Sequence, residues 1–355
     1  MTPPTIIIGG GLSGLYAARL LHAREESFLV LEARSEWGGR IRTELRGGCP
    51  FDLGPSWFWP DLNPRMARLV RELNLSHHGQ NTRGDALIEE PGGTIRRQAH
   101  REIDPRNARR LAGGSHTLIE ALLPALPADC LLPGHRVTSL ERHDAHVSIT
   151  ATTTNGERSF TATRVIIALP PRLLAHTITI TPSLPSPLTA SLRNTPTWMA
   201  GDAKFFATYN RPFWRENDLS GTAYCESGPL SESHDASLPG GPGALLGFLI
   251  PAPAERSALG EALVPLCLEQ LARLFGPAAA TPLDVLFMDW AKESFTATPL
   301  DLPLVEHPAY GLPECTRGLW DDRLRLAGTE SAPEHGGHLE GALEAAEAAT
   351  RNPAC

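Results

Sequence analysis

The residues most able to do chemistry in this chain lie in its first forty positions: three spaced glycines and one acid. Gly9, Gly11 and Gly14 form the pattern G-x-G-x-x-G, and Glu32 follows eighteen positions after the last of them. In such a pattern the first glycine makes a tight turn, the second lets a pyrophosphate approach the backbone, and the third lets a helix pack closely on a strand. An acid at this distance can accept hydrogen bonds from a ribose. The spacing therefore predicts a dinucleotide site.

The elements that would position these residues surround them in the sequence. Thr5–Ile8 is a short apolar run rich in β-branched residues, which predicts a strand leading into the glycines. A second apolar run, Phe28–Leu31, predicts the strand that ends at Glu32. Between them, apolar residues recur at helical spacing, at Leu12, Leu15, Ala18 and Leu21. Free N–H groups at the start of this helix would hold the phosphates. Because strand, helix and acid agree, we favour a dinucleotide site over a purely structural turn.

A second pair of glycines narrows the kind of dinucleotide. Residues 32–34 read E-A-R and residues 38–43 read G-G-R-I-R-T, and a nicotinamide site alone does not need this second pair. The run resembles the E-A-R…G-G-R-x-x-T segment of the flavin-containing amine oxidases, a family that includes monoamine, polyamine and L-amino-acid oxidases and their desaturase relatives. The resemblance implies that this segment lines the pyrophosphate and ribose of FAD, with Arg40 adding a fixed charge of fork geometry.

Further segments resemble blocks of the same family, in the family's order. They are F-D-L-G-P-S-W at 51–57, G-G at 113–114, R-V at 136–137, V-I-I-A-L-P at 165–170, K at 204 followed by P-F-W at 212–214, D-W at 289–290, A-G-T-E at 327–330 and G-H-L-E-G-A at 337–342. Taken together, the glycine pattern and the resemblance assign FAD contact to Gly9, Gly11, Leu12, Ser13, Gly14, Glu32, Ala33, Arg34, Gly38, Gly39, Arg40, Gly54, Pro55, Ser56, Trp57, Val137, Ala168, Trp290, Gly328, Thr329, Glu330, His338 and Leu339.

The resemblance also implies catalytic residues. In the family a lysine holds a water against flavin N5, and Lys204 matches it; the chain has only one other lysine, Lys292. Burial should lower the pKa of Lys204. The alternative for Lys204 is a strand lysine with its charged end in solvent.

The chain departs from the family at the substrate face of the flavin. Amine oxidases place two aromatic side chains there as a cage for the amine, and one of these positions is occupied by His338. For the other, Tyr310 is the nearest candidate and Trp320 the second, although Tyr310 could equally be an ordinary core or surface aromatic. His338 could accept a proton or hydrogen-bond a polar substrate, or have no chemical role.

Bulk properties exclude several classes of protein. The chain has 355 residues and a net charge of −8, which argues against a nucleic-acid surface. No apolar run approaches the length of a membrane span, and a strand begins so early that we expect no signal peptide. Six cysteines without a C-x-x-C pair predict reduced thiols in the cytoplasm, and neither they nor the 13 histidines have metal-site spacing. Since no cysteine matches a flavin-bonding position, we expect non-covalent FAD; Cys315 lies too close to Ala327 for that role. The oligomeric state stays open.

The predicted fold class is α/β: a two-domain FAD-linked oxidoreductase with a Rossmann-like FAD domain and a mixed α/β substrate domain. We expect a discontinuous FAD domain from residues 1–60, 106–180 and 316–355, and a substrate domain from 61–105 and 181–315. Asn155 and Gly156 predict a two-residue hairpin turn. Residues 255–275 predict one helix, and the Ser-, Gly- and Pro-rich residues 226–243 predict an exposed loop. A helix at 341–350 would aim its positive N-terminus at the flavin ring.

The predicted function is that of an FAD-dependent oxidase of amines. A C–H beside nitrogen would give its hydride to flavin N5, the imine would hydrolyse, and O₂ would reoxidise the flavin to yield H₂O₂. Two alternatives stay open: a desaturase-like or nicotinamide-linked flavoenzyme on the same fold, and a non-catalytic FAD-binding protein.

Overall fold

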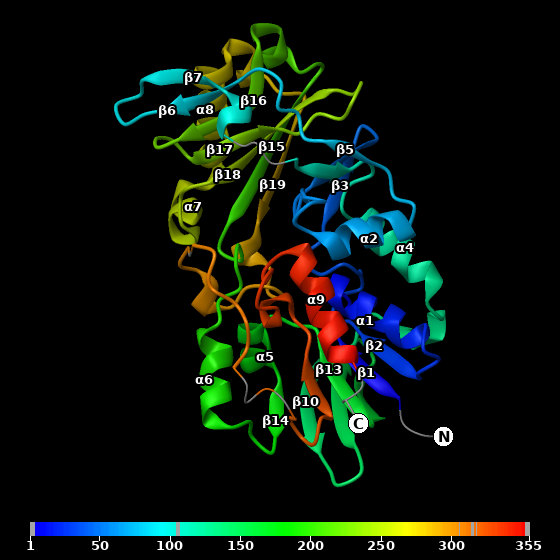
Figure 1. Cartoon of the computed structure of the whole chain (residues 1–355). Helices are drawn as coiled ribbons and strands as arrows, with labels where there is room; N and C mark the ends of the chain where they lie inside the picture. Colours follow the sequence, from blue (N-terminus) through cyan, green and yellow to red (C-terminus); the bar gives the residue numbers. More distant parts are fainter. Residues whose placement is uncertain (1–3, 104–106, 305, 314–315, 317, 352–355) are drawn as a thin grey trace.

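The computed structural model describes residues 4–103, 107–304, 306–313, 316 and 318–351. Two sheet-based halves lie one above the other, and the segments near both ends of the chain belong to the lower half (Figure 1). The fold is the mixed α/β architecture that the sequence predicts, with a Rossmann-like first segment. No helix in these described ranges is long and apolar enough to cross a membrane.

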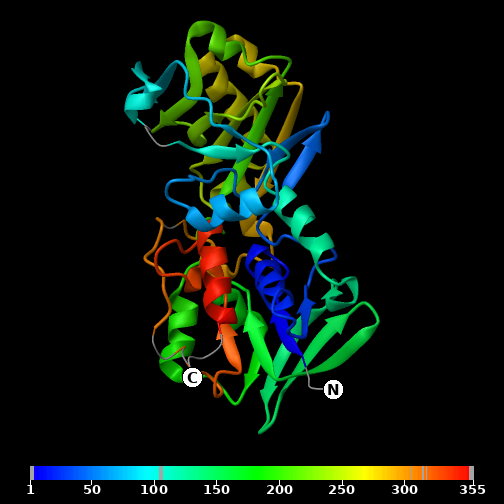
Figure 2. The ribbon, with the colours of Figure 1, turned by 45° about the vertical axis from the view of Figure 1, so that its right-hand side comes forward.

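The lower half is built on a five-stranded parallel sheet in the order β20-β13-β1-β2-β9. Its strands are β1 (Thr5–Ile8), β2 (Phe28–Leu31), β9 (Leu131–Leu132), β13 (Arg164–Ile167) and β20 (Leu324–Leu326). The helices α1 (Leu12–His22) and α9 (Leu339–Thr350) lie side by side on one face (Figures 1 and 2). Alternate residues of β1 serve the two faces: Ile7 packs with these helices, and Ile6 and Ile8 belong to the opposite core.

A four-stranded sheet, in the order β12-β11-β10-β14, packs on the other face of the five-stranded sheet, and the two sheets enclose a second core. Its strands are β10 (Arg136–Arg142), β11 (Val147–Thr153), β12 (Gly156–Ala162) and β14 (Thr179–Thr181), and the helices α5 (Pro171–Thr177) and α6 (Ser186–Asn194) follow along the chain. The predicted hairpin turn is wrong by one residue. Thr153 pairs with Gly156, so Thr154 and Asn155 form the connection and Gly156, at φ +106°, begins the next strand.

The upper half is built on a seven-stranded sheet in the order β19-β15-β18-β17-β16-β6-β7. Five strands come from residues 181–315, here called the second insertion: β15 (Ala203–Tyr209), β16 (Leu219–Cys225), β17 (Leu230–Asp235), β18 (Gly243–Leu249) and β19 (Asp284–Asp289). Residues 61–105, the first insertion, add β6 (Asp85–Glu89) and β7 (Ile95–Ala99), with β6 parallel to β16. The sheet therefore joins segments more than a hundred residues apart in sequence.

Two predictions about the second insertion are wrong. Residues 226–243 are not simply a loop, because β17 lies inside them with Leu230 and Asp235 buried. Residues 255–275 are not one helix, because Gly260, at φ +52°, separates α7 (Pro253–Leu259) from α8 (Leu263–Phe275). Gly260 has ψ −126°, which is outside the helical region, and a glycine can adopt this conformation at little cost, so α7 ends there.

Smaller elements complete the fold. They are β3 (Thr43–Arg46) paired with β4 (Cys49–Asp52), β5 (His77–Gly79) paired with β8 (Arg109–Leu111), and the helices α2 (Pro64–Glu72), α3 (His100–Ile103) and α4 (Thr117–Leu122). The division into an FAD and a substrate domain stays a prediction. Because α2 and α6 pack into cores of the lower half, we propose that the two boundaries lie after these helices rather than at residues 61 and 181.

Candidate active site

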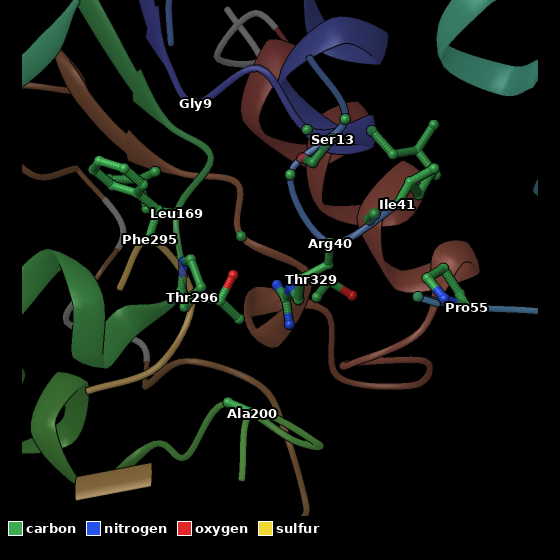
Figure 3. A pocket seen from close by; sticks show the side chains of 18 of the residues that line it. Gly9, Ser13, Arg40, Ile41, Pro55, Leu169, Ala200, Phe295, Thr296 and Thr329 are labelled. Carbon is green, nitrogen blue, oxygen red and sulfur yellow. The ribbon is translucent and has the colours of Figure 1, made fainter. Parts of the chain in front are cut away.

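A cavity of about 480 Å³ lies where the two halves meet. Its lower wall is formed by the residues that follow β1, β2 and β13, at the carboxyl ends of these strands, where open parallel sheets bind ligands. Its upper wall is formed by side chains of β15, β17 and β18. Figure 3 shows residues from widely separated parts of the chain around it, among them Ser13, Arg40, Phe295 and Thr329.

The glycine motif at residues 9–14 and the glycine pair at residues 38–39 lie against each other at one end of the cavity. Gly11 precedes α1 and forms a bridge with Gly38, and both line the cavity. A Cβ on Gly11 would have its nearest neighbours in Gly38 O at 3.6 Å and Gly39 Cα at 3.8 Å, which are ordinary contacts. The protein thus leaves space beside the start of α1, as a pyrophosphate on the helix N-terminus requires.

Gly14 does not line the cavity. A Cβ there would lie 1.9 Å from the carbonyl oxygen of Gly9, so this glycine permits the close packing of α1 on the turn before it. The hydroxyl of Ser13, which does line the cavity, donates to the carbonyl oxygen of Ala327 and thereby ties α1 to the residue after β20.

Glu32 is 4% exposed and lines the cavity directly after β2. Its two carboxylate oxygens accept from the backbone N–H groups of Gly10 (2.6 Å) and Arg34 (2.8 Å). Glu32 therefore braces the glycine turn, a structural role that the sequence pattern does not predict. Its contact with a ribose stays a prediction.

Arg40 lines the cavity and is held by Glu330, at 2.6 Å and 3.2 Å between guanidinium nitrogens and carboxylate oxygens. Burial opposes the charge on Arg40, but the ion pair with Glu330 raises its pKa above the usual value. Glu330 itself is fully buried and does not line the cavity. Its carboxylate positions Arg40, and its contact with FAD stays a prediction.

The other end of the cavity combines Val137 with a segment that the sequence did not single out. Phe295 and Thr296 line it, and the guanidinium of Arg34 lies 5.2 Å from the centroid of the Phe295 ring. Arg34 also approaches Thr296 Oγ1 at 3.4 Å and Glu293 at 3.2 Å. A planar cation over an aromatic ring makes a flat surface suited to a nucleobase.

Most of the predicted FAD contacts line this one cavity. They are Gly9, Gly11, Leu12, Ser13, Glu32, Ala33, Arg34, Gly38, Gly39, Arg40, Gly54, Pro55, Ser56, Trp57, Val137, Ala168, Trp290, Gly328, Thr329, His338 and Leu339. Among the described cysteines, none lines the cavity, which fits non-covalent FAD; Cys315 lies outside the described residues. The described residues also contain no group of side chains that could hold a metal.

Lys204 is 5% exposed and faces the cavity from β15. Its ammonium donates to Ser56 Oγ (2.9 Å) and to the carbonyl oxygens of Asp52 (3.2 Å) and Gly54. These contacts tie the upper sheet to the 51–57 segment, and they use all three donors of a charged lysine.

Burial lowers the pKa of Lys204 to about 7, opposed by the carboxylate of Asp52 and assisted by the nearby charge of Arg110. A neutral amine keeps two donors and gains a lone pair. In that form Lys204 can accept a hydrogen bond from a water, which the charged form cannot do.

Trp198, rather than Tyr310, is the second aromatic side chain at the cavity beside His338. The two rings lie 4.9 Å apart at 45°, and both line the cavity. Tyr310 does not line it: its hydroxyl donates to Pro196 O (2.8 Å) and accepts from Trp198 N (3.0 Å), so Tyr310 supports the Trp198 backbone from behind. The cavity lining therefore does not include Tyr310, and its cage role stays a prediction. Trp320, the second candidate, is buried in the core between the two lower sheets.

His338 stands at the N-terminal cap of α9. Its Nδ1 donates to the carbonyl oxygen of Gly336 (3.1 Å), and burial lowers its pKa. A neutral imidazole that donates through Nδ1 keeps Nε2 as an acceptor. His338 can therefore accept a hydrogen bond from an N–H group in the cavity.

A Rossmann-like cradle with two glycine pairs, joined to a second sheet that carries a buried lysine, defines an FAD-dependent oxidoreductase. The comparisons with known proteins agree. The model of the family "Flavin containing amine oxidoreductase" matches residues 90–352, and that of an NAD(P)-binding Rossmann-like domain matches residues 7–73. The chain belongs to the flavin-containing amine oxidoreductase family, as its motifs predict.

Similar proteins match along nearly the whole chain. Human amine oxidase [flavin-containing] B is 26% identical, over 98% of this chain and 85% of that protein. An L-amino acid dehydrogenase of Synechocystis is 25% identical, over 98% and 93%. The structure resembles a putrescine oxidase (TM-score 0.80) and the cyclohexylamine oxidase of Brevibacterium oxydans (TM-score 0.78), each 20% identical and covering 99% of this chain and 98% of the other.

Proposed function

We propose that this protein is an FAD-dependent oxidase of small amines that uses O₂ as the electron acceptor and forms H₂O₂. When bound, FAD supplies the redox chemistry by accepting a hydride from the C–H beside the amine nitrogen. The observation that carries the proposal is Lys204, the buried lysine that joins the two walls of the cavity.

The protonation state of Lys204 supports the proposal. With a pKa near 7, a substantial fraction of this lysine is neutral at physiological pH. A neutral amine that donates to protein carbonyls can still hold a water by accepting one of its protons. Lys204 would thus keep an ordered water at the reacting end of the cavity.

Trp198 and His338 would orient the substrate. The flat face of Trp198 suits the apolar carbons or the cation of an amine. Nε2 of His338 can accept from the amine nitrogen, which aligns the adjacent C–H.

The four cysteines in the described part of the chain are free, which supports a cytoplasmic location.

Anaerobic stopped-flow mixing tests the proposal. A panel of primary alkyl and arylalkyl amines should bleach the flavin of the holoenzyme, and O₂ should restore its colour with one H₂O₂ per cycle. Rapid bleaching by NADH or NADPH instead of amines would identify a nicotinamide-linked enzyme. If no donor reduces the bound flavin, a non-catalytic role replaces the proposal.

A further inference from the structure

A third ring, that of His307, stands behind the two aromatic side chains of the cavity. Its centroid lies 4.6 Å from that of Trp198 and 5.0 Å from that of His338. Trp198 and His338 are themselves 4.9 Å apart and line the cavity. His307 is exposed and does not line it. His307 therefore contacts both cavity rings from outside the cavity.

One carbonyl oxygen joins the two imidazoles. Gly336 O accepts from Nε2 of His307 at 2.9 Å and from Nδ1 of His338 at 3.1 Å. A carbonyl oxygen has two lone pairs, so it can accept both bonds at once, but it cannot donate. Each ring nitrogen that meets it must therefore carry a hydrogen. Contact with Gly336 O thus selects the Nδ1–H tautomer of a neutral His338 and leaves Nε2 as an acceptor.

The peptide that carries this oxygen joins two glycines, Gly336 and Gly337. A Cβ on Gly336 would lie 2.4 Å from Tyr310 Cβ, so this position excludes larger residues. A Cβ on Gly337 would lie 3.1 Å from Trp198 Cε3, and Gly337 has φ +80°. Glycine adopts φ of either sign at similar energy. The peptide plane between the two glycines can therefore turn over with little strain and point its oxygen away from His338.

The hydrogen bond from His307 opposes this rotation. Within the part of the chain that the structure describes, only the two imidazoles donate to Gly336 O. His338 belongs to the same turn, since its backbone N–H donates to His335 O at 3.2 Å. His307 instead comes from a segment 29 residues away in sequence, which Tyr310 anchors by donating to Pro196 O. His307 thus holds the carbonyl from outside the turn.

The tautomer of His338 has a chemical consequence for an amine. When a hydride leaves the carbon, the lone pair of the neighbouring nitrogen becomes the second bond of C=N. An imidazole that accepts from the amine N–H leaves this lone pair free, whereas one that donates through Nε2 would engage it. The Nδ1–H tautomer is therefore the form suited to amine oxidation.

We propose that His307 is a positioning residue that, through Gly336 O, locks His338 in the Nδ1–H tautomer, so that Nε2 meets the substrate amine as an acceptor. The kinetic consequence rests on the proposed amine oxidation, whereas the tautomer itself does not. His307 acts through His338 and does not touch the substrate.

Two substitutions separate the hydrogen bond of His307 from its ring. His307→Phe keeps an aromatic ring and removes the donor, and His307→Gln keeps a nitrogen donor and removes the ring. Long-range ¹H–¹⁵N correlation spectra of the holoprotein with labelled histidine report the tautomer, and His338→Gln assigns the signal. His338 should be a single Nδ1–H tautomer in the wild type and in His307→Gln, and a mixture in His307→Phe. His307→Leu, which also lacks the donor, replaces His307→Phe if the latter does not retain flavin.

Flavin reduction by an amine gives the second measurement. In His307→Phe, kcat should fall by roughly tenfold, the upper end for the loss of one hydrogen bond, with KM nearly unchanged, and His307→Gln should restore it. His143→Phe is the matched control, because the His143 ring stacks on His146 at 4.5 Å outside the cavity. It should change neither the tautomer nor kcat.

Three results would overturn the inference: an Nε2–H tautomer of His338 in the wild type, an unchanged tautomer in His307→Phe, or the same mixture in His307→Phe and His307→Gln. The last result would assign the effect to the ring rather than to the donor. If no amine reduces the flavin, the proposed function fails, and the spectra still decide whether His307 sets the tautomer.

Discussion

Gly11 and Gly14 belong to the same glycine motif, but their surroundings differ. Gly11 has an extended backbone and borders the cavity, with no protein atom closer than 3.6 Å to the place of a Cβ. Gly14 faces the carbonyl oxygen of Gly9, where a Cβ would be only 1.9 Å away. One glycine leaves room for a ligand, and the other leaves room for the protein itself.

Gly11→Val should therefore keep the fold and lose FAD, because the branched side chain would occupy the space of the pyrophosphate. Gly14→Ala should lower the melting temperature even of the apoprotein, with an overpacking cost of about 1–3 kcal/mol. Flavin absorbance after desalting and thermal unfolding of both apoproteins check this. Stoichiometric flavin in Gly11→Val would refute the assignment of the turn.

Lys204→Met keeps the apolar stem and removes the donors and the charge. FAD should still bind, with a perturbed visible spectrum, and flavin reduction or reoxidation should slow by roughly 10²-fold or more, as for the loss of one positioned catalytic group. Lys292→Met is the control, since Lys292 is exposed and does not line the cavity. Rapid-mixing kinetics measure both steps, and equal rates in the two variants would remove Lys204 from the active site.

At the scale of elements, the sequence predicted best where a motif dictates local geometry. The strands and helix around the glycine turn need only neighbouring residues, so spacing was sufficient. The place of Glu232 in the cavity lining was not predicted, because this residue of β17 lies in a Ser-, Gly- and Pro-rich stretch and its position beside Phe248 depends on strand register. Trp198 was missed because it lies in an irregular segment after α6. No local periodicity marks such positions.

The contact between α2 and α9 depends on one acid. Glu340, with a fully buried side chain, accepts from the backbone N–H groups of Arg65 (3.0 Å) and Met66 (2.9 Å) and pairs with the Arg65 guanidinium at 3.2 Å. The first N–H groups of a helix have no partner within the helix. Glu340 thus caps α2 from another element.

Glu340→Ala should consequently destabilise the protein by about 1–3 kcal/mol, since buried donors lose their acceptor. Thermal unfolding measures the change. Glu344→Ala, on the same helix, is a suitable control because neither carboxylate oxygen of Glu344 makes a hydrogen bond to α2. A similar loss in both variants would mean that the helix, and not the cap, sets the effect.

For the molecule as a whole, Lys204 makes stability depend on pH. Its pKa is about 7 in the folded protein and about 10.4 in an unfolded chain. Between these values the unfolded chain binds more protons, so the free energy of unfolding rises with pH, by at most about 1.4 kcal/mol per pH unit. Lys204→Met lacks this contribution. From about pH 7 to about pH 9 the melting temperature of the wild-type apoprotein should rise relative to that of the variant, and parallel curves would contradict the buried, neutral lysine.

The cradle for FAD is assembled from both ends of the chain. β20 pairs with β13, the Ser13 hydroxyl meets Ala327 O, and Glu330 holds Arg40. During translation the glycine turn leaves the ribosome long before the residues that complete its surroundings. A nascent chain therefore carries the entire glycine motif without a place for the cofactor, and a message truncated before residue 324 would encode a protein that displays the motif and holds no flavin.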